Sequence, residues 1–208
     1  MEQRGNEITA EPTEPAEPVR PWQMIRQWLR AAPVQNKTLF GQVGRACVGH
    51  GDMAFVESLL SEHQEWKYVV ELGTGSGLAT VWLGTAMKLR DGVVYTWDQN
   101  RPKPFYLRHW PHGVVFRHGD IYEGPEVEII REHVSRPNTI VICDGGDKTR
   151  ELEMYAPYLA DGNGIMCHDW ASEVDHDRAR VVVERHGLRP VLHDWAASCL
   201  ARYRAWIK

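Results

Sequence analysis

Three glycines within five positions, directly after an apolar run, constrain this chain more than any other feature. The β-branched pair Val69 and Val70 is typical of a strand that is covered on both faces. Glycine adopts backbone angles, and allows a close approach of ligands, that a Cβ would prevent. The stretch therefore predicts a buried strand, a glycine turn at Gly73, Gly75 and Gly77, and then a helix. Open α/β sheets bind nucleotide-like ligands at such a turn.

The spacing of these glycines favours S-adenosylmethionine over a dinucleotide. They fall as G-x-G-x-G and not as the G-x-G-x-x-G of the dinucleotide fingerprint, and Glu71 ends the strand just before them. A carboxylate at this place repels a pyrophosphate but attracts the ammonium and sulfonium groups of S-adenosylmethionine. The stretch resembles the first motif of class I S-adenosylmethionine-dependent methyltransferases. A tight turn without any ligand is the alternative interpretation.

The length and charge of the chain predict a single domain without an electrostatic surface for nucleic acid. The 208 residues suit one domain with a sizeable core. The net charge is −4, and five glutamates against two arginines in the first twenty residues account for −3 of it. The remainder is nearly neutral, so no nucleic-acid partner is expected.

The cysteines and the apolar runs indicate a reduced, cytoplasmic protein. The four cysteines are scattered without Cys-x-x-Cys spacing, which is typical of small buried thiols. No apolar run approaches the ~20 residues that span a bilayer, and the amino terminus is acidic, unlike a signal peptide. We expect neither export nor a membrane partner, and a homo-oligomer stays open.

The amino-terminal part divides into a tail and a helical segment. Residues 1–21 are rich in proline and glutamate, too polar to bury a core, and are expected to be a disordered tail. Residues 22–208 form the predicted domain, which begins with a helical segment over 22–63. Trp22, Ile25 and Trp28 recur there at helical spacing, and Asp52 is positioned to cap a second helix.

Strand and helix patterns alternate along the rest of the chain and predict an α/β fold. This alternation implies a mainly parallel sheet of seven strands, with helices on both faces and one antiparallel strand near an edge. The last two strands are expected to form a hairpin. Strands are predicted at 69–72, 93–98, 114–117, 139–144, 165–170, 188–195 and 199–207, and helices at 78–89, 127–134, 149–159 and 174–186.

Several of these strands end in acidic residues. In an open parallel sheet the ligand lies beyond the carboxyl ends of the strands, where Glu71, Asp98, Asp144 and the pair His168-Asp169 would converge. Because carboxylates at one rim repel each other, their convergence predicts a bound positive species, either S-adenosylmethionine, a divalent cation or both.

Asp98 is the predicted ribose ligand. It lies 21 residues after Gly77, where a βαβ unit places a carboxylate that can accept from both ribose hydroxyls. A strand-end aspartate that begins a turn is the alternative. Asp120 follows the third strand, and the resemblance to class I methyltransferases implies that it holds the adenine amino group.

A closer resemblance rests on Asp144-Gly145-Gly146-Asp147-Lys148 and on the run from Tyr158 to Trp170. These motifs resemble the metal-dependent small-molecule O-methyltransferases, both the catechol O-methyltransferase type and the cephalosporin hydroxylase-like and macrolide-sugar methyltransferase group. The resemblance covers roughly residues 41–170 and implies the Rossmann-like methyltransferase three-layer sandwich.

The same resemblance implies a metal site and candidate catalytic groups. The metal ligands would be Asp144, His168 and Asp169, holding Mg or Mn; an imidazole ligand suits Mn²⁺, Fe²⁺ or Zn²⁺ better than Mg²⁺. A hydrogen-bonded pair that fixes the turn is the alternative role of His168 and Asp169. Lys148 lies one residue away from the position of the catalytic lysine of the catechol type, and with a lowered pKa it could take the proton of the substrate hydroxyl. A solvated lysine in the first turn of a helix is the alternative interpretation. Asp144 and His168 are further catalytic candidates, and Asp147 is a rival base.

These observations predict an S-adenosylmethionine-dependent O-methyltransferase that acts on a hydroxyl of a small metabolite or sugar. The cofactor residues would be Glu71, Gly73, Gly75, Gly77, Asp98 and Asp120. The alternatives are a non-catalytic S-adenosylmethionine-binding partner protein and an NAD-dependent oxidoreductase, against which the glycine spacing counts.

Overall fold

The computed structural model describes residues 50–100, 111–198 and 201–208. In these residues a seven-stranded sheet runs in the order β3-β2-β1-β4-β5-β7-β6. Neighbouring strands are parallel except where β7 pairs with β5 and β6, which confirms the expected single antiparallel strand near an edge. The strands are β1 Tyr68–Leu72, β2 Val93–Asp98, β3 Val114–His118, β4 Thr139–Cys143, β5 Gly164–Cys167, β6 Arg189–Val191 and β7 Arg204–Ile207.

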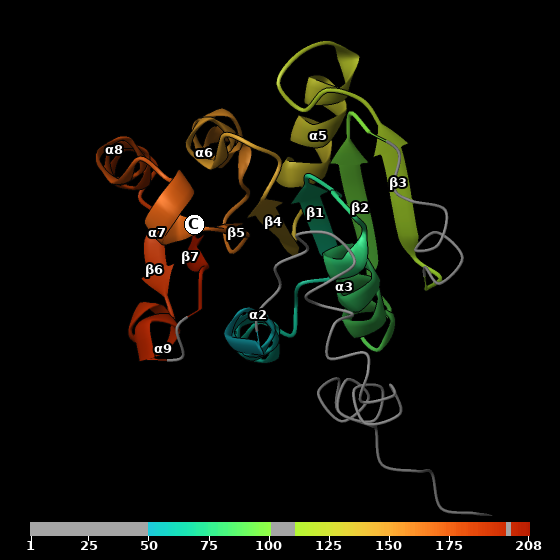
Figure 1. Ribbon diagram of the computed structural model, residues 1–208, viewed down its shortest axis with the longest axis horizontal. Helices are drawn as coiled ribbons and strands as arrows, with labels where there is room; N and C mark the ends of the chain where they lie inside the picture. Colours follow the sequence, from blue (N-terminus) through green and yellow to red (C-terminus); the bar gives the residue numbers. More distant parts are fainter. Residues whose placement is uncertain (1–49, 101–110, 199–200) are drawn as a thin grey trace, which may run out of the picture.

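Helices cover both faces of the sheet and complete the expected three layers (Figure 1). Helices α2, α3 and α9 pack on one face, and α5, α6 and α8 pack on the other. None of the described helices is long and apolar enough to cross a membrane. Their bounds are α2 His50–Glu62, α3 Leu78–Lys88, α5 Pro125–Ser135, α6 Lys148–Tyr155, α8 His176–Arg185 and α9 His193–Ser198, with the short helices η2 Ala156–Tyr158 and α7 Trp170–Glu173 between them.

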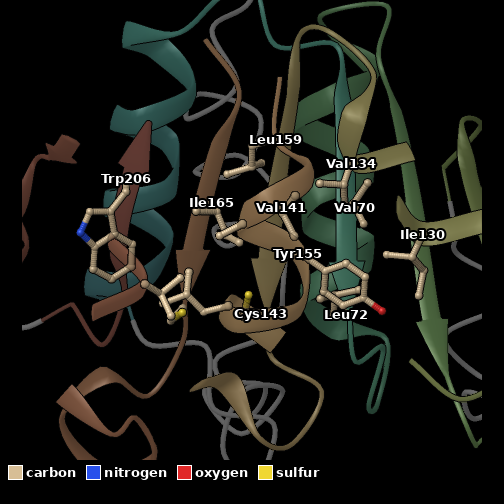
Figure 2. Close-up of a cluster of buried hydrophobic side chains, with 14 of the residues drawn as sticks. Val70, Leu72, Ile130, Val134, Val141, Cys143, Tyr155, Leu159, Ile165 and Trp206 are labelled. Carbon is tan, nitrogen blue, oxygen red and sulfur yellow. The ribbon is translucent and has the colours of Figure 1, made fainter. Parts of the chain in front are cut away.

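The central strands are apolar on both faces because both faces are covered. All five residues of β4 are buried, and alternate side chains enter different cores. Val141 and Cys143 join the core under α5 and α6, where Figure 2 shows them beside Tyr155. Ile140 and Ile142 join the core under α2 and α3. The sheet is thereby fixed in register, and its strand ends hold the loops described below.

The carboxyl-terminal part differs from the prediction. The strand expected over 188–195 ends at Val191, and helix α9 stands between β6 and β7 where a short hairpin turn was expected. Leu192 adopts a left-handed backbone angle (φ 55°) that ends the strand, and its carbonyl accepts the first helical bond from Ala196. The predicted antiparallel pairing of the two last strands is confirmed, with Arg189 opposite Ile207.

Three element boundaries also differ. The strand expected over 165–170 ends at Cys167, because Asp169 adopts a left-handed angle (φ 49°) and Trp170 begins α7. Helix α6 ends at Tyr155 and continues as the 3₁₀ turn η2, which contains Pro157. Helix α2 begins at His50, so Asp52 lies in its first turn and is not its N-cap. The predicted tail over 1–21 and most of the helical segment 22–63 lie outside the described residues.

Candidate functional site

The glycine turn joins β1 to α3 and lies between the ends of the two neighbouring strands. Gly73, Gly75 and Gly77 all have positive φ angles, of 95°, 53° and 83°. The Gly73 amide donates to the carbonyl of Trp97 on β2 (2.9 Å). On the other side, a Cβ at Gly73 would lie 2.3 Å from the Asp144 carbonyl oxygen after β4. The backbone must therefore be bare at Gly73 for the turn to fit between the two strands.

Asp98 and the glycine turn are bonded directly. The Gly75 amide donates to Oδ2 of Asp98 (2.8 Å), and the Asn100 amide donates to Oδ1 (2.7 Å). Asp98 also lines a hollow of about 120 Å³ beside Gly73, at the carboxyl ends of β1, β2 and β4. The hollow is lined by Gly73, Trp97, Asp98, Gln99, Asn100, Gly119, Ile121, Tyr122 and Gly145.

Glu71 lies beneath the turn and is nearly inaccessible to water. Its side chain is buried, and the Thr80 hydroxyl of α3 donates to Oε2 (2.6 Å). Burial raises the pKa of Glu71 to about 8, the hydrogen bonds with Thr80 and Thr96 oppose this rise, and the charges of Asp144 and Asp98 add to it. Asp144 and Asp98 thus lie near enough for their charges to act on Glu71, as the expected convergence of these strand ends requires.

Asp120 is not among the residues that line the hollow. Its two oxygens accept from the Gln99 side chain (2.8 Å) and from the Tyr122 amide (2.7 Å). Its neighbours Gly119 and Ile121 do line the hollow. Asp120 therefore shapes the loop after β3 and holds Gln99 at the edge of the hollow.

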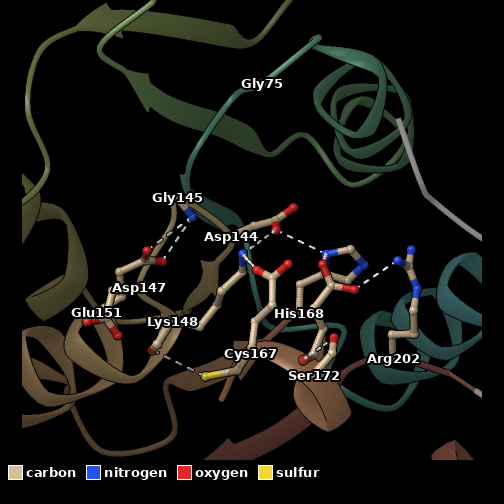
Figure 3. A network of polar contacts seen from close by, with 12 residues as sticks. Gly75, Asp144, Gly145, Asp147, Lys148, Glu151, Cys167, His168, Ser172 and Arg202 are labelled. Carbon is tan, nitrogen blue, oxygen red and sulfur yellow. Dashed lines mark hydrogen bonds and ion pairs between the residues drawn. The ribbon is translucent and has the colours of Figure 1, made fainter. Parts of the chain in front are cut away.

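Asp144, His168 and Asp169 come together where β4 and β5 end. Figure 3 shows Asp144 and His168 facing each other. Nδ1 of His168 lies 3.0 Å from Oδ1 of Asp144 and 3.3 Å from Oδ2 of Asp169. Burial lowers the pKa of His168, but the hydrogen bond to Asp144, the Asp52 carboxylate 3.8 Å from Nε2 and the charges of Asp144 and Asp169 outweigh it and raise this pKa to about 9. The ring is a cation near neutral pH and donates to Asp144.

Lys148 is neither solvated nor a lysine of lowered pKa. Its side chain is buried, with Nζ bonded to Glu173 and 3.7 Å from Oδ1 of Asp144. Burial lowers its pKa, but the bond to Glu173 and the charges of Asp144, Glu173 and Glu151 raise the pKa above its ordinary value. The expectation that Lys148 has a lowered pKa is wrong, because these carboxylates surround it.

Arg202 and Asp52 extend this cluster and were missed as site residues by sequence reasoning. Arg202 donates to Oδ1 of Asp169 (2.8 Å) and, through two nitrogens, to Oδ2 of the buried Asp52 (2.8 and 3.1 Å). The same Asp52 oxygen lies 3.8 Å from Nε2 of His168. Tyr203 packs over the His168 ring at 4.5 Å. Asp52 and Arg202 are 150 residues apart, so no local pattern links them.

The three side chains of the cluster fit a divalent metal ion only when His168 is neutral, because a protonated ring has no lone pair to offer at Nδ1. Two ligand atoms that each lie about 2.1 Å from an ion, at a right angle, are about 3.0 Å apart, close to the spacings between His168 Nδ1 and the two carboxylates. All three ligand atoms lie within 4.8 Å of one another. One nitrogen and two oxygens suit Mn²⁺, Fe²⁺ or Zn²⁺ better than Mg²⁺.

A larger hollow, of about 470 Å³, lies elsewhere. It is formed by α6, η2 and α8, with Pro157, Arg178 and Val181 among its lining residues, and no strand end contributes to it. We place the site at the strand ends, because the glycine turn, the acidic residues and His168 meet there.

Comparisons with known proteins identify the kind of domain that carries this site. Residues 70–170 match the family model described as a methyltransferase domain, a segment that runs from β1 to the start of α7. No curated protein matches the chain.

Solved structures share the fold at low sequence identity. A protein from Staphylococcus aureus described as a caffeoyl-CoA O-methyltransferase superposes with a TM-score of 0.62 at 14% identity, over 91% of this chain and 98% of that chain. An O-methyltransferase from Bacillus cereus in complex with SAH gives 0.53 at 13% identity, over 90% and 98%. The protein CmcI with Mg and SAM gives 0.54 at 19% identity, over 77% and 72%.

Proposed function

We propose that the chain is a class I S-adenosylmethionine-dependent methyltransferase that methylates a hydroxyl oxygen of a small metabolite or sugar. The match of residues 70–170 to a methyltransferase domain and the fold shared with an O-methyltransferase support this proposal. The observation that carries this proposal is the adjacency of two sites. Gly145 lines the hollow beside the glycine turn, and it directly follows Asp144 of the Asp144-His168-Asp169 cluster. A methyl donor in the first site would present its methyl group to an acceptor at the second.

The cofactor occupies the hollow and the glycine turn in this proposal. Asp98 accepts from the ribose hydroxyls, and Asp120 holds the adenine end through the loop after β3. Gly73, Gly75 and Gly77 leave room for the methionine part. Glu71 lies below it and would supply negative charge once the cationic cofactor displaces the proton that its raised pKa retains at neutral pH. Two of the similar solved structures are described with SAM or SAH bound, which supports the choice of cofactor.

The chain's own groups orient the acceptor and take its proton. The sulfonium already activates the methyl group, so alignment of the acceptor oxygen and removal of its proton are the remaining tasks. The Asp144 side chain is 28% exposed, more open than His168 or Lys148, and is the group best placed to accept the proton. Without a bound metal, the His168 and Lys148 cations lie 3.0 and 3.7 Å from its Oδ1 and stabilise its charge.

A divalent metal is the second part of the proposal. Asp144, His168 and Asp169 would hold it, and a bound ion would lower the pKa of the acceptor hydroxyl as a Lewis acid. The similar structure that is described with Mg and SAM supports this part.

Calorimetric titration with S-adenosylmethionine and with NADH tests the cofactor. We expect S-adenosylmethionine to bind and NADH not to bind, and Asp98→Ala to weaken binding about tenfold or more, since a charged hydrogen-bond partner is lost. Labelled S-adenosylmethionine then reports methyl transfer to a panel of catechols and hydroxylated sugars. A preference for NADH would end the proposal.

Titration with Mn²⁺ alone tests the metal independently of turnover. Asp144→Asn and Asp169→Asn should abolish Mn²⁺ binding, while Asp161→Asn, in the exposed turn before β5, should leave it intact. Equal Mn²⁺ binding by all three variants would remove the metal and leave the methyltransferase proposal standing.

A further inference from the structure

Glu151 is a buried carboxyl group in α6 that the proposed reaction does not use. Its side chain is fully inaccessible, yet both oxygens are engaged. The Gly145 amide donates to Oε1 (3.1 Å) and Oε2 (3.2 Å), and the Tyr122 hydroxyl donates to Oε1 (2.6 Å). Figure 3 shows the Gly145 contact beside the Asp144 cluster.

The two partners of Glu151 lie on different walls of the cofactor hollow. Gly145 belongs to the turn after β4, and Tyr122 belongs to the loop between β3 and α5. The Tyr122 hydroxyl also accepts from the Asp147 amide (2.8 Å), so the phenol joins that loop to the start of α6. One buried carboxyl group therefore ties together two loops that are far apart in sequence.

The loop that carries Ile121 and Tyr122 packs closely against Gly145 and α6. A Cβ at Gly145 would lie 2.3 Å from Cδ1 of Ile121, a third lining residue of the hollow. Arg150 of α6 stacks over the Tyr122 ring, with its guanidinium carbon 4.6 Å from the ring centre. Arg150 thus holds the ring of Tyr122, and Glu151 holds its hydroxyl group.

We propose that Glu151, acting through Gly145 and Tyr122, is a positioning residue that holds the nucleoside end of the cofactor site at its bound width. This inference rests on the proposed function, because it assumes that the hollow takes the nucleoside. Glu151 itself touches neither the cofactor nor the acceptor. Its effect is on the width of the hollow and therefore on cofactor affinity.

Two substitutions of similar shape test the proposal. Glu151→Gln turns one acceptor oxygen into an amide that cannot accept, and Tyr122→Phe removes the hydroxyl between Glu151 and Asp147. We expect each to weaken S-adenosylhomocysteine binding about tenfold or more in calorimetry, since a buried hydrogen bond is lost and its partner is left unsatisfied. The double variant should lose little more than either single variant, because the residues act as one unit.

Three further measurements separate positioning from general destabilisation. The affinity of the variants for 5′-methylthioadenosine should fall by the same factor, because this molecule keeps the 5′-thioadenosine part of S-adenosylhomocysteine and lacks its amino acid part. Tyr95→Phe removes another half-buried tyrosine hydroxyl, which Arg136 contacts near the opposite end of the sheet, and should bind both ligands like the wild type. Thermal unfolding without ligand shows that each titration is made on folded protein.

Wild-type affinity in both Glu151→Gln and Tyr122→Phe, with S-adenosylhomocysteine bound by the wild-type chain, would overturn the inference. Failure of the wild-type chain to bind S-adenosylhomocysteine would instead overturn the proposed function. The two failures are therefore distinguishable in one set of titrations.

Discussion

At the scale of single residues, Glu71 shows how folding changes an ionisable group. Its carboxyl group is 2% exposed, and burial raises its pKa from 4.5 to about 8. A raised pKa means that the folded chain holds a proton that the unfolded chain has lost at pH 7. The stability associated with Glu71 is therefore complete below pH 4.5, and it is lost as the pH rises through about 8.

The substitution Glu71→Gln should remove this pH dependence. Between pH 5 and 8 we expect the free energy of unfolding of the wild type to fall, relative to Glu71→Gln, by about 1.4 kcal/mol per pH unit at most. Urea unfolding at several pH values measures the difference. A constant difference between the two proteins would contradict it.

Cofactor binding should also depend on Glu71. If a cationic methionine group binds above the ionised carboxylate, binding at pH 7 must release a proton from Glu71. Calorimetry in buffers of different ionisation enthalpy should show this release in the wild type, and Glu71→Gln should show less release and weaker binding. Binding without proton exchange at pH 7 would contradict a direct charge interaction.

At the scale of elements, the glycine turn allows a matched comparison. At Gly75 a Cβ would meet nothing within 4 Å, so Gly75→Ala should cost only the left-handed backbone penalty, about 1–2 kcal/mol. At Gly73 the Cβ would collide with the Asp144 carbonyl oxygen, so Gly73→Ala should cost much more and separate β1 from the turn after β4. Urea unfolding of the two variants measures the costs, and equal costs would contradict the tight approach at Gly73.

The elements that sequence patterns predicted well are those with local causes. Strand β4 is an unbroken apolar run, and β1 leads into a turn whose glycines mark it, so both were found. Helix α9 was missed because the apolar residues at 188–195 fit a strand as well as a helix, and only the left-handed angle at Leu192 decides between them.

The site residues follow the same rule: those with a local sequence signal could be predicted, and those whose partners are brought together only by folding could not. The sequence placed five polar residues at one rim of the sheet, because they lie at the carboxyl ends of its parallel strands or directly after them. Glu71 and Asp98 are near or at the ends of β1 and β2, and Asp144, His168 and Asp169 follow β4 and β5. Glu151 and Arg202 were missed since their partners are distant in sequence or lie on another element. The raised pKa of Lys148 depends on Glu173, which only folding brings to it.

At the scale of the whole molecule, Asp52 and Arg202 join the two ends of the described chain at the site. Asp52 lies in α2 and is 2% exposed, and Arg202, just before β7, contacts it through its backbone amide (2.7 Å) and its guanidinium. Arg202→Met should destabilise the fold by about 3–5 kcal/mol in urea unfolding, because the buried carboxylate loses this counter-charge.

A double-mutant cycle shows whether this cost belongs to the pair. Asp52→Asn should recover part of the stability of Arg202→Met, since it removes the buried charge, so the double variant should be more stable than the sum of the single losses predicts. Arg178→Met breaks the exposed ion pair with Glu153 and should have a much smaller effect. If Arg202→Met unfolds at the same urea concentration as the wild type, the Asp52–Arg202 pair does not stabilise the fold. Tyr203, which packs on His168, would then be the next residue to test.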